Sequence, residues 1–202
     1  MQRTHSDCLF ARYADDGVVH CRSQKQAEIV MQSIALRLEE CGLMMHPEKS
    51  KIVYCKDSNR TKVYSQVQFT FLGFTFRPRK AINRQGRIYA GFLPSASDEA
   101  LKRMRKVVHG WKLHRQTPAN LAELAEHYNP IIRGWWQYYG AFYRRSMYRL
   151  FQYIDLKLKQ WARRKYKTLC RHGRRSAEWL SKMKKVCPQI FSHWNVIGGT
   201  VG

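Results

Sequence analysis

Acidic residues are scarce in this sequence. It contains 14 Asp and Glu against 37 Lys and Arg, which gives a formal net charge of +23 and a pI near 10.2. A compact chain of that charge repels itself, so the composition predicts a polyanionic partner. Phe, Trp and Tyr supply 13% of the residues, whereas a plain polybasic tail is poor in aromatics. We therefore expect nucleic acid as the partner, ahead of an anionic membrane surface.

Other features are missing as well. No run of about 18 apolar residues occurs, so no membrane span is predicted, and no apolar signal core follows Met1. The six cysteines form no Cys-x-x-Cys pair, which predicts a reduced, intracellular (cytoplasmic) protein with buried thiols. A metal site would require His172, Cys187 and His193 to meet in space, and separate core or surface positions are the simpler interpretation.

Charge is distributed unevenly along the chain. Residues 1–97 carry 15 basic and 8 acidic residues, whereas residues 98–202 carry 22 and 6. The change falls near Pro94-Ser95-Ala96-Ser97, a composition typical of a domain boundary. We expect an α+β protein with strands and one packed helix in residues 1–95, an all-α domain in residues 96–175, and a tail in residues 176–202.

The stretch Tyr13-Ala14-Asp15-Asp16-Gly17 carries the clearest chemistry. Two β-prone runs flank it, Cys8–Arg12 and Val18–Cys21, which predicts a β-hairpin with Asp15 and Asp16 at its tip. Adjacent carboxylates repel each other, and Mg²⁺ would neutralise them because it prefers carboxylate oxygens and substrate phosphates. A solvated turn is the alternative, since Asp and Gly are ordinary turn residues.

Local signals predict the remaining elements of the first half. A capping box at Ser23 and Gln26 opens an amphipathic helix that ends at Gly42. Gly73 would allow a close backbone approach within a buried strand. The other elements expected here are strands at Ile52–Tyr54 and Phe69–Phe76, a basic loop at 77–87, and a returning strand at Ile88–Leu93.

The second half shows helical periodicity throughout. Ser97, followed by two acidic residues, is expected to cap a first helix. Further helices are predicted to begin at Thr117-Pro118, at Asn129-Pro130 and at Ser146. Apolar stripes on these helices, such as Leu158 to Trp161, predict a small bundle in residues 98–175 that folds alone.

Basic and aromatic residues alternate between Asn129 and Lys167. This stretch has eleven aromatic residues, ten Lys and Arg, and one acid, Asp155. Core packing explains part of the aromatics, but a bundle does not need a surface of one sign, so a face that follows RNA phosphates is expected. The helical period would place Arg163, Arg164 and Lys167 together on it. The candidate RNA-binding residues are Arg133, Arg144, Arg145, Arg149, Lys157, Arg163, Arg164, Lys165 and Lys167.

Three motifs in order resemble a known family. Tyr13-Ala-Asp-Asp, then Gly42-Leu…His46-Pro-Glu-Lys49, then Phe71-Leu-Gly-Phe74 is similar to the second half of the palm of reverse transcriptases encoded by group II introns. Asn129-Pro-Ile-Ile-Arg-Gly-Trp-Trp-x-Tyr-Tyr, followed by the long basic helix, resembles the maturase-specific (thumb, or X) domain of the same family. The resemblance extends from about residue 7 to residue 195.

The resemblance implies roles for several residues. Asp15 would be a ligand of both catalytic metals, which are Mg²⁺, and Asp16 would be its neighbour in the site. Lys49 would lie near the leaving pyrophosphate and act as a general acid, although an ordinary surface charge is the alternative. The turn that grips the primer strand would consist of Phe71, Leu72, Gly73 and Phe74.

The resemblance also implies partners and activities. The family performs RNA-directed DNA polymerisation on an RNA template and DNA primer. Its thumb domain binds the group II intron RNA and assists splicing, which implies an intracellular ribonucleoprotein of a mobile element. The family's upstream palm strand carries another catalytic aspartate and is expected to be missing here, as is the zinc-bearing endonuclease module.

Three interpretations therefore stay open for this chain. It would synthesise DNA only with a separately encoded N-terminal half of the polymerase, because Asp15 and Asp16 alone are not expected to hold two metals. It would act instead as a non-catalytic RNA-binding maturase module. Otherwise it is a decayed fragment of a mobile element that folds only in its helical half.

Overall fold

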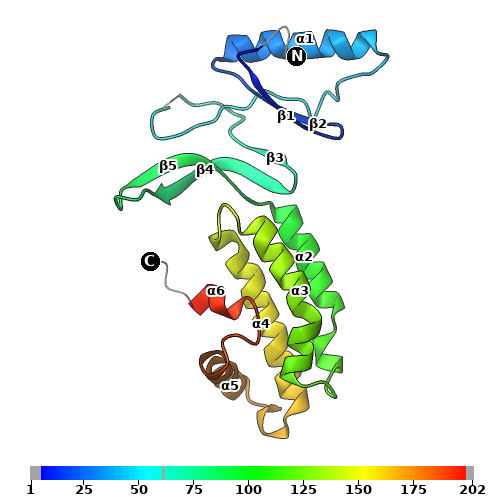
Figure 1. Cartoon of the computed structure of the whole chain (residues 1–202), viewed down its shortest axis with the longest axis vertical. Coiled ribbons are helices and arrows are strands. Elements are labelled where there is room, and N and C mark those ends of the chain that lie inside the picture. The colour runs from blue at the N-terminus through cyan, green and yellow to red at the C-terminus, as the bar shows by residue number, and fades with distance from the viewer. Residues whose placement is uncertain (1–5, 61, 199–202) are drawn as a thin grey trace. The chain divides into compact units, whose positions relative to one another are not determined.

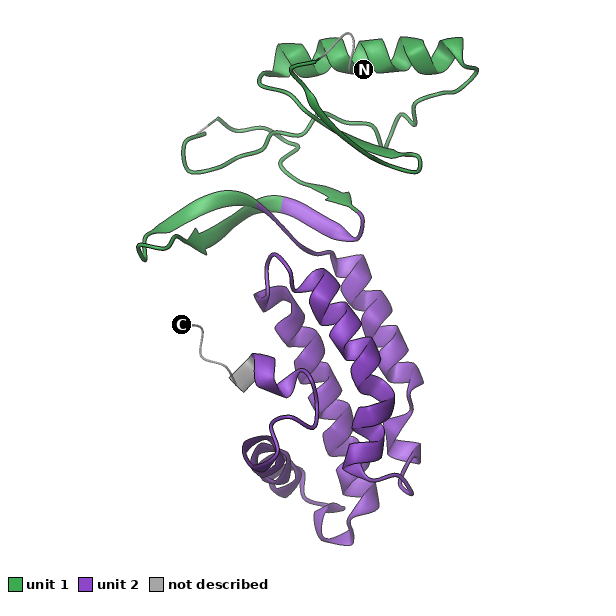
Figure 2. Cartoon of the chain, in the orientation of Figure 1, with its two compact units in different colours: residues 1–71, 77–92 green, residues 72–76, 93–202 purple. Residues whose placement is uncertain are grey.

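The computed structural model describes residues 6–60 and 62–198 (Figure 1). It contains strands and helices, which confirms the expected α+β class. The chain divides into two compact units (Figure 2): unit 1 comprises residues 1–71 and 77–92, and unit 2 comprises residues 72–76 and 93–202. The outermost parts of the predicted palm segment (1–95) and tail (176–202), residues 1–5 and 199–202, lie outside the described residues.

The predicted hairpin is present in unit 1. Strands β1 (Leu9–Tyr13) and β2 (Asp16–His20) pair antiparallel, with Leu9 opposite His20 and Tyr13 opposite Asp16. This register leaves a two-residue turn of Ala14 and Asp15, and Ala14 adopts a φ of 52°. Asp15 therefore occupies the turn itself, whereas Asp16 is the first residue of β2.

Helix α1 (Gln24–Glu40) follows the hairpin. Ser23 Oγ accepts a hydrogen bond from Gln26 N over 3.2 Å, as a cap should. In a capping box the Gln26 side chain would accept a hydrogen bond from the backbone N–H of the N-cap residue Ser23. Here it accepts instead from the backbone N–H of Arg22, one residue earlier, over 2.7 Å. Gly42, with a φ of 69°, follows the end of the helix as predicted.

A three-stranded sheet follows, in the order β3 (Phe69–Phe71), β4 (Phe74–Ile82) and β5 (Ile88–Ala96). The prediction of one continuous strand over residues 69–76 is wrong, because Leu72 and Gly73 adopt φ angles of 50° and 78° and form a turn between β3 and β4. The predicted returning strand is confirmed by β5. Most of the predicted basic loop is strand β4, and only residues 83–87 connect β4 to β5.

The predicted strand at Ile52–Tyr54 is wrong. Tyr54 N donates to Gln66 O over 2.8 Å, and the rings of Tyr54 and Tyr64 lie 4.5 Å apart. These isolated contacts do not form the repeated hydrogen bonds of a β-ladder, and the segment is irregular rather than a strand. A β-prone sequence becomes a strand only where a neighbouring strand supplies its hydrogen bonds.

Unit 2 is a helical bundle that opens with α2 (Asp98–Gly110). Ser97 Oγ accepts from Ala100 N over 3.1 Å, which confirms the predicted cap. After the short 3₁₀ helix η1 (Leu113–Arg115), helix α3 runs without a break over Leu121–Tyr139 and begins with a capping box between Asn120 and Glu123. Helices beginning at Thr117-Pro118 and at Asn129-Pro130 are therefore not found.

Pro130 lies inside α3. A proline there removes one backbone hydrogen bond and disfavours a continuous helix. Tyr128 and Ile132, on either side of it, are nevertheless buried in the same core. We attribute the continuous helix to this shared packing, which favours one axis for both halves of α3.

The longest helix is α4 (Arg145–Lys165). Ser146 is not its N-cap as predicted, because its hydroxyl donates to Tyr143 O over 2.8 Å and the helix begins one residue earlier. Lys167 belongs to the 3₁₀ helix η2 (Lys167–Leu169), so the helical spacing that placed it beside Arg163 does not apply. Helices α5 (Gly173–Val186) and α6 (Trp194–Gly198) complete the unit.

The hydrophobic core lies in unit 2. Seven side chains of α4 are 0% exposed: Met147, Leu150, Phe151, Ile154, Leu158, Trp161 and Ala162. Leu180, Phe191 and Trp194 join this core, so residues beyond 175 pack into the bundle. Among the described residues of unit 1, by contrast, Val30 is the only buried hydrophobic residue.

In the part of the chain that the structure describes, no helix combines the length and the apolar character needed to cross a bilayer.

Candidate nucleic-acid-binding site

Asp15 and Asp16 are exposed at the end of the β1–β2 hairpin. Nowhere in residues 6–60 and 62–198 do three or more His, Cys, Asp or Glu side chains gather in a way that would hold a metal ion. A two-metal site needs enough carboxylates to hold ions about 3.5–4 Å apart. The described residues thus supply two carboxylates and do not by themselves fit a pair of Mg²⁺ ions.

Lys49 is exposed in an irregular segment of unit 1. None of the ion pairs within the described residues includes it. The structure therefore brings no charged partner to Lys49, and its role as a general acid stays a prediction.

The turn at Leu72 and Gly73 is fixed by the end of α3. Tyr138 Oη donates a hydrogen bond to Leu72 O over 3.0 Å. A Cβ built on Gly73 would lie 3.0 Å from Tyr139 Oη, so a larger residue would require the Tyr139 side chain or the turn to shift. Ser97 N also donates to Gly73 O over 2.8 Å. The turn therefore has a defined backbone geometry within unit 2.

Phe74 holds the other side of this turn. Its side chain is buried, and its ring centroid lies 5.1–5.4 Å from those of Tyr138, Tyr139 and Phe142. Leu72 remains 37% exposed at the tip, and Phe71 is half-buried in β3. The sequence predicted core packing for part of these aromatics but gave no sign of this contact, because residues 72–74 and 138–142 are far apart in the sequence.

The candidate RNA-binding cations differ in what they contact. Seven are exposed: Arg133, Arg144, Arg145, Arg149, Arg163, Arg164 and Lys167. Lys165 Nζ instead donates to Thr117 O over 2.8 Å and to Ala119 O over 2.9 Å. It ties α4 to the segment before α3, and we expect Lys165 to contribute to stability more than to RNA binding.

Two other candidates lie against aromatic rings. Arg144 lies 5.7 Å from the ring centroid of Trp136, and Lys157 lies 5.0 Å from that of Tyr153. Such cation–π contacts orient the side chain without neutralising its charge. Across the described residues, none of the nine candidates forms an ion pair with Asp or Glu. Their positive charge is available to an anion.

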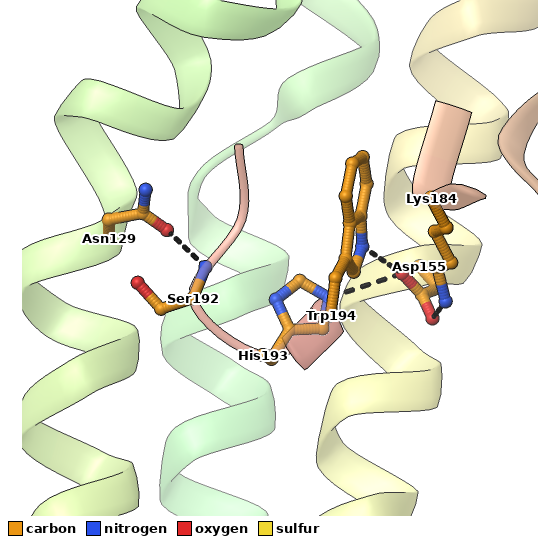
Figure 3. Close-up of polar contacts among 6 residues, drawn as sticks. All are labelled: Asn129, Asp155, Lys184, Ser192, His193 and Trp194. Atoms are coloured by element: carbon orange, nitrogen blue, oxygen red, sulfur yellow. Dashed lines mark hydrogen bonds and ion pairs between the residues drawn. The ribbon is translucent and has the colours of Figure 1, made fainter. Parts of the chain in front are cut away.

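The one acid in this stretch, Asp155, is used inside the bundle (Figure 3). Its carboxylate accepts from Lys184 Nζ, from His193 Nε2 (3.1 Å) and from Trp194 Nε1 (3.0 Å). Burial alone would raise the pKa of Asp155, but hydrogen bonds and charge from His193 and Lys184 hold it below its usual value. The carboxylate therefore links α4 to α5 and to the segment before α6.

A second contact fastens the same segment to α3 (Figure 3). The Asn129 side chain accepts from Ser192 N over 2.9 Å and donates to Ile190 O over 2.7 Å. Sequence analysis treated Asn129 as a helix cap. Its side chain is used instead for a contact with residues about sixty positions away, which no local pattern predicts.

Comparison with protein-family models gives two matches. Residues 1–76 match the reverse transcriptase (RNA-dependent DNA polymerase) family, and residues 101–179 match the group II intron, maturase-specific domain. The first match includes β1, β2 and the turn at Leu72 and Gly73, and the second includes α3, α4 and the exposed cations. No curated protein matched the chain. The two matches, in this order, agree with the resemblance in the sequence motifs, and the chain belongs to the family of group II intron reverse transcriptase/maturases.

Proposed function

We propose that unit 2 binds structured group II intron RNA as a maturase and thumb module. The observation that carries this proposal is the large excess of positive over negative charge in this unit. Residues 98–202 contain 22 Lys and Arg against 6 Asp and Glu, and Asp155 is used inside the bundle. A surface of this kind gains affinity for RNA by displacing the counterions condensed on its phosphates.

For unit 1 we propose the role of a partial polymerase palm. Asp15 and Asp16 would contribute carboxylates to the Mg²⁺ site, and the turn at Leu72 and Gly73, which follows unit 1 and belongs to unit 2, would position the primer strand. The remaining carboxylates would come from a further palm segment, such as a separately encoded N-terminal half. Metal ions bound there would supply the charge stabilisation for nucleotidyl transfer.

Exposed apolar side chains support the need for a further palm segment. Leu9 and Phe10 in β1 are 77% and 46% exposed, and Ile29 and Leu36 of α1 are exposed too. Val30 is the only buried hydrophobic residue described in this unit. Within the described residues, β1 and β2 form a two-stranded sheet, so strand edges and apolar side chains are available to a further segment of the palm.

Two measurements test these roles separately. Binding of the full chain to a structured intron RNA, titrated with salt, should give a steep log–log dependence. Primer extension on an RNA template with Mg²⁺ should fail for the chain alone. Absence of RNA binding at low salt would refute the first role, and robust extension that disappears in Asp15→Ala would refute the second.

A non-catalytic RNA-binding maturase is the second candidate function. It is favoured by the absence of a third metal-binding side chain beside Asp15 and Asp16 in the described residues. It predicts that no polypeptide supplying the missing palm strand restores DNA synthesis, although RNA binding persists.

A further inference from the structure

A solvent-open hollow of about 440 Å³ lies on unit 2. It is lined by His114 of η1, by Gln160, Arg163 and Arg164 of the last turns of α4, and by Cys170 just after η2. No carboxylate is among these lining residues. The hollow thus gathers two guanidinium groups, an imidazole and an amide without an acid to neutralise them.

The polar groups of the hollow are partly oriented by neighbours. Arg163 Nε donates to Cys170 O over 3.4 Å, which leaves the two terminal nitrogens of its guanidinium as donors. Gln160 Oε1 accepts from Lys157 Nζ over 3.3 Å, so its amide N–H groups also remain as donors. An oriented arginine with further N–H donors beside it is suited to a phosphate oxygen.

His114 experiences this positive field directly. Partial burial lowers the pKa of His114, and the charges of Arg164 and Arg115, of Lys157 on α4 and of His109 on α2 lower it further. Each of these neighbours is basic, so none of them supplies a negative charge to balance a protonated His114 imidazole. An anion placed in the hollow would supply that balance.

We propose that this hollow holds one phosphate group of a bound RNA, with Arg163 and Arg164 as the charged donors and Gln160 and His114 as additional donors. The proposal rests on the proposed RNA-binding function and assigns it a defined contact point. We assign the phosphate to an internal phosphodiester, because the hollow is open to solvent and requires no chain end.

The first test removes the two arginines from the full chain. The double variant Arg163→Gln, Arg164→Gln should flatten the log–log salt dependence of binding to an intron RNA hairpin by about 1.4 to 1.8 units, since each phosphate contact contributes about 0.7 to 0.9. The control is Arg174→Gln, Arg175→Gln on α5, which removes the same charge away from the hollow. Equal effects of the two double variants would overturn the proposal.

Folding is checked in the same samples. Arg163 and Arg164 are exposed, so far-UV circular dichroism and the melting temperature should not change. The single variant Arg164→Gln avoids the Arg163–Cys170 contact and should flatten the slope by about half as much. An unchanged slope in Arg164→Gln would count against the site even if the double variant lost affinity.

The second test uses pH. A phosphate in the hollow should favour protonated His114, so the salt slope of the wild-type chain at pH 5.5 should exceed that at pH 8 by up to about one contact. The increment should disappear in His114→Asn and persist in His127→Asn, whose side chain is exposed on α3. An increment that survives in His114→Asn would exclude His114 from the site.

The third test locates the phosphate. RNA should slow alkylation of Cys170, which is exposed and lines the hollow, and should do so less in the double arginine variant. Hairpins with a 5′-hydroxyl or a 5′-phosphate should bind equally. Preference for the 5′-phosphate, lost in the double variant, would overturn the assignment to an internal phosphodiester. A wild-type chain that binds no RNA refutes the proposed function, whereas RNA binding without Cys170 protection refutes only this site.

Discussion

The hydroxyl of Tyr138 donates a hydrogen bond to the backbone carbonyl of Leu72 over 3.0 Å. The resemblance in the sequence motifs predicts that the Leu72 turn grips the primer strand, and Tyr138 lies on α3 within the match to the maturase-specific domain. The hydrogen bond therefore connects a predicted polymerase motif to the domain for which we propose RNA binding.

Gly73→Ala should destabilise the chain more than Gly86→Ala. Both glycines have a φ of 78°, so the backbone strain of the substitution, about 1 kcal/mol, is shared. Only at Gly73 does the added Cβ meet Tyr139 Oη, at 3.0 Å, whereas nothing lies within 4 Å of it at Gly86. The melting temperatures of the two variants measure the difference, and equal values would show that the turn can move away from α3.

Asp155→Ala should lower the free energy of unfolding by about 3 kcal/mol, because it leaves Lys184, His193 and Trp194 without their shared acceptor in a buried site. Glu178→Ala is the control. Its ion pair with Arg174 is exposed, so its loss should cost less than about 1 kcal/mol. Urea denaturation followed by tryptophan fluorescence measures both, and a small effect of Asp155→Ala would mean that water replaces the carboxylate.

Acid should destabilise unit 2 beginning below about pH 6.5. Burial lowers the pKa of His193, so below the ordinary histidine value of 6.5 the unfolded chain takes up a proton that the folded chain does not. Asp155, whose pKa is also lowered, adds a second loss when the pH falls below about 4. Unfolding free energies measured from pH 8 down to about pH 2 should therefore decline in two steps.

The variant His193→Gln isolates the first of these steps. Glutamine can donate to Asp155 but does not titrate, so the decline between pH 6.5 and 5 should shrink while the lower step remains. If the decline in unfolding free energy between pH 6.5 and 5 is unchanged in this variant, other histidines cause it. His193 Nε2 must be the donor to the carboxylate, which leaves Nδ1 buried without a partner among the described residues.

Local sequence signals predicted the elements whose causes are local. The hairpin around Asp15, the Ser97 cap and the glycine after α1 follow from residues that are close to one another in the sequence. The same signals failed at Asn129-Pro130, which has the pattern of a helix start but lies inside α3. There the outcome depends on core contacts with other helices, which a pattern of neighbours does not contain.

The candidate site was predictable in residue type but not in detail. Charge identified the basic residues of α4, yet Lys165 binds backbone carbonyls and Lys167 lies outside the helix. Sequence analysis also missed His114, which reaches the same hollow from η1 and had no motif to mark it. The roles of Asp15, Asp16 and Lys49 stay predictions, since they depend on carboxylates beyond those that the described residues bring together.

The final prediction concerns residues beyond 175, which were expected to form a tail outside an independently folding bundle. Leu180, Phe191 and Trp194 are buried in the core, and Asn129 and Asp155 fasten the same segment by hydrogen bonds. A chain ending at residue 175 exposes the core that these side chains cover. It should melt well below the full chain, by 10 °C or more at about 4 °C per kcal/mol.

A chain ending at residue 198 serves as the control, because it keeps every residue of this contact and should melt with the full chain. Both truncated chains retain His114, Arg163 and Arg164. RNA binding by the shorter chain should therefore be lost when that chain melts, and it should return on cooling to the extent that the bundle refolds. Equal melting temperatures for chains ending at 175 and 198 would instead show that residues 98–175 suffice for the fold and that the final segment only rests on it.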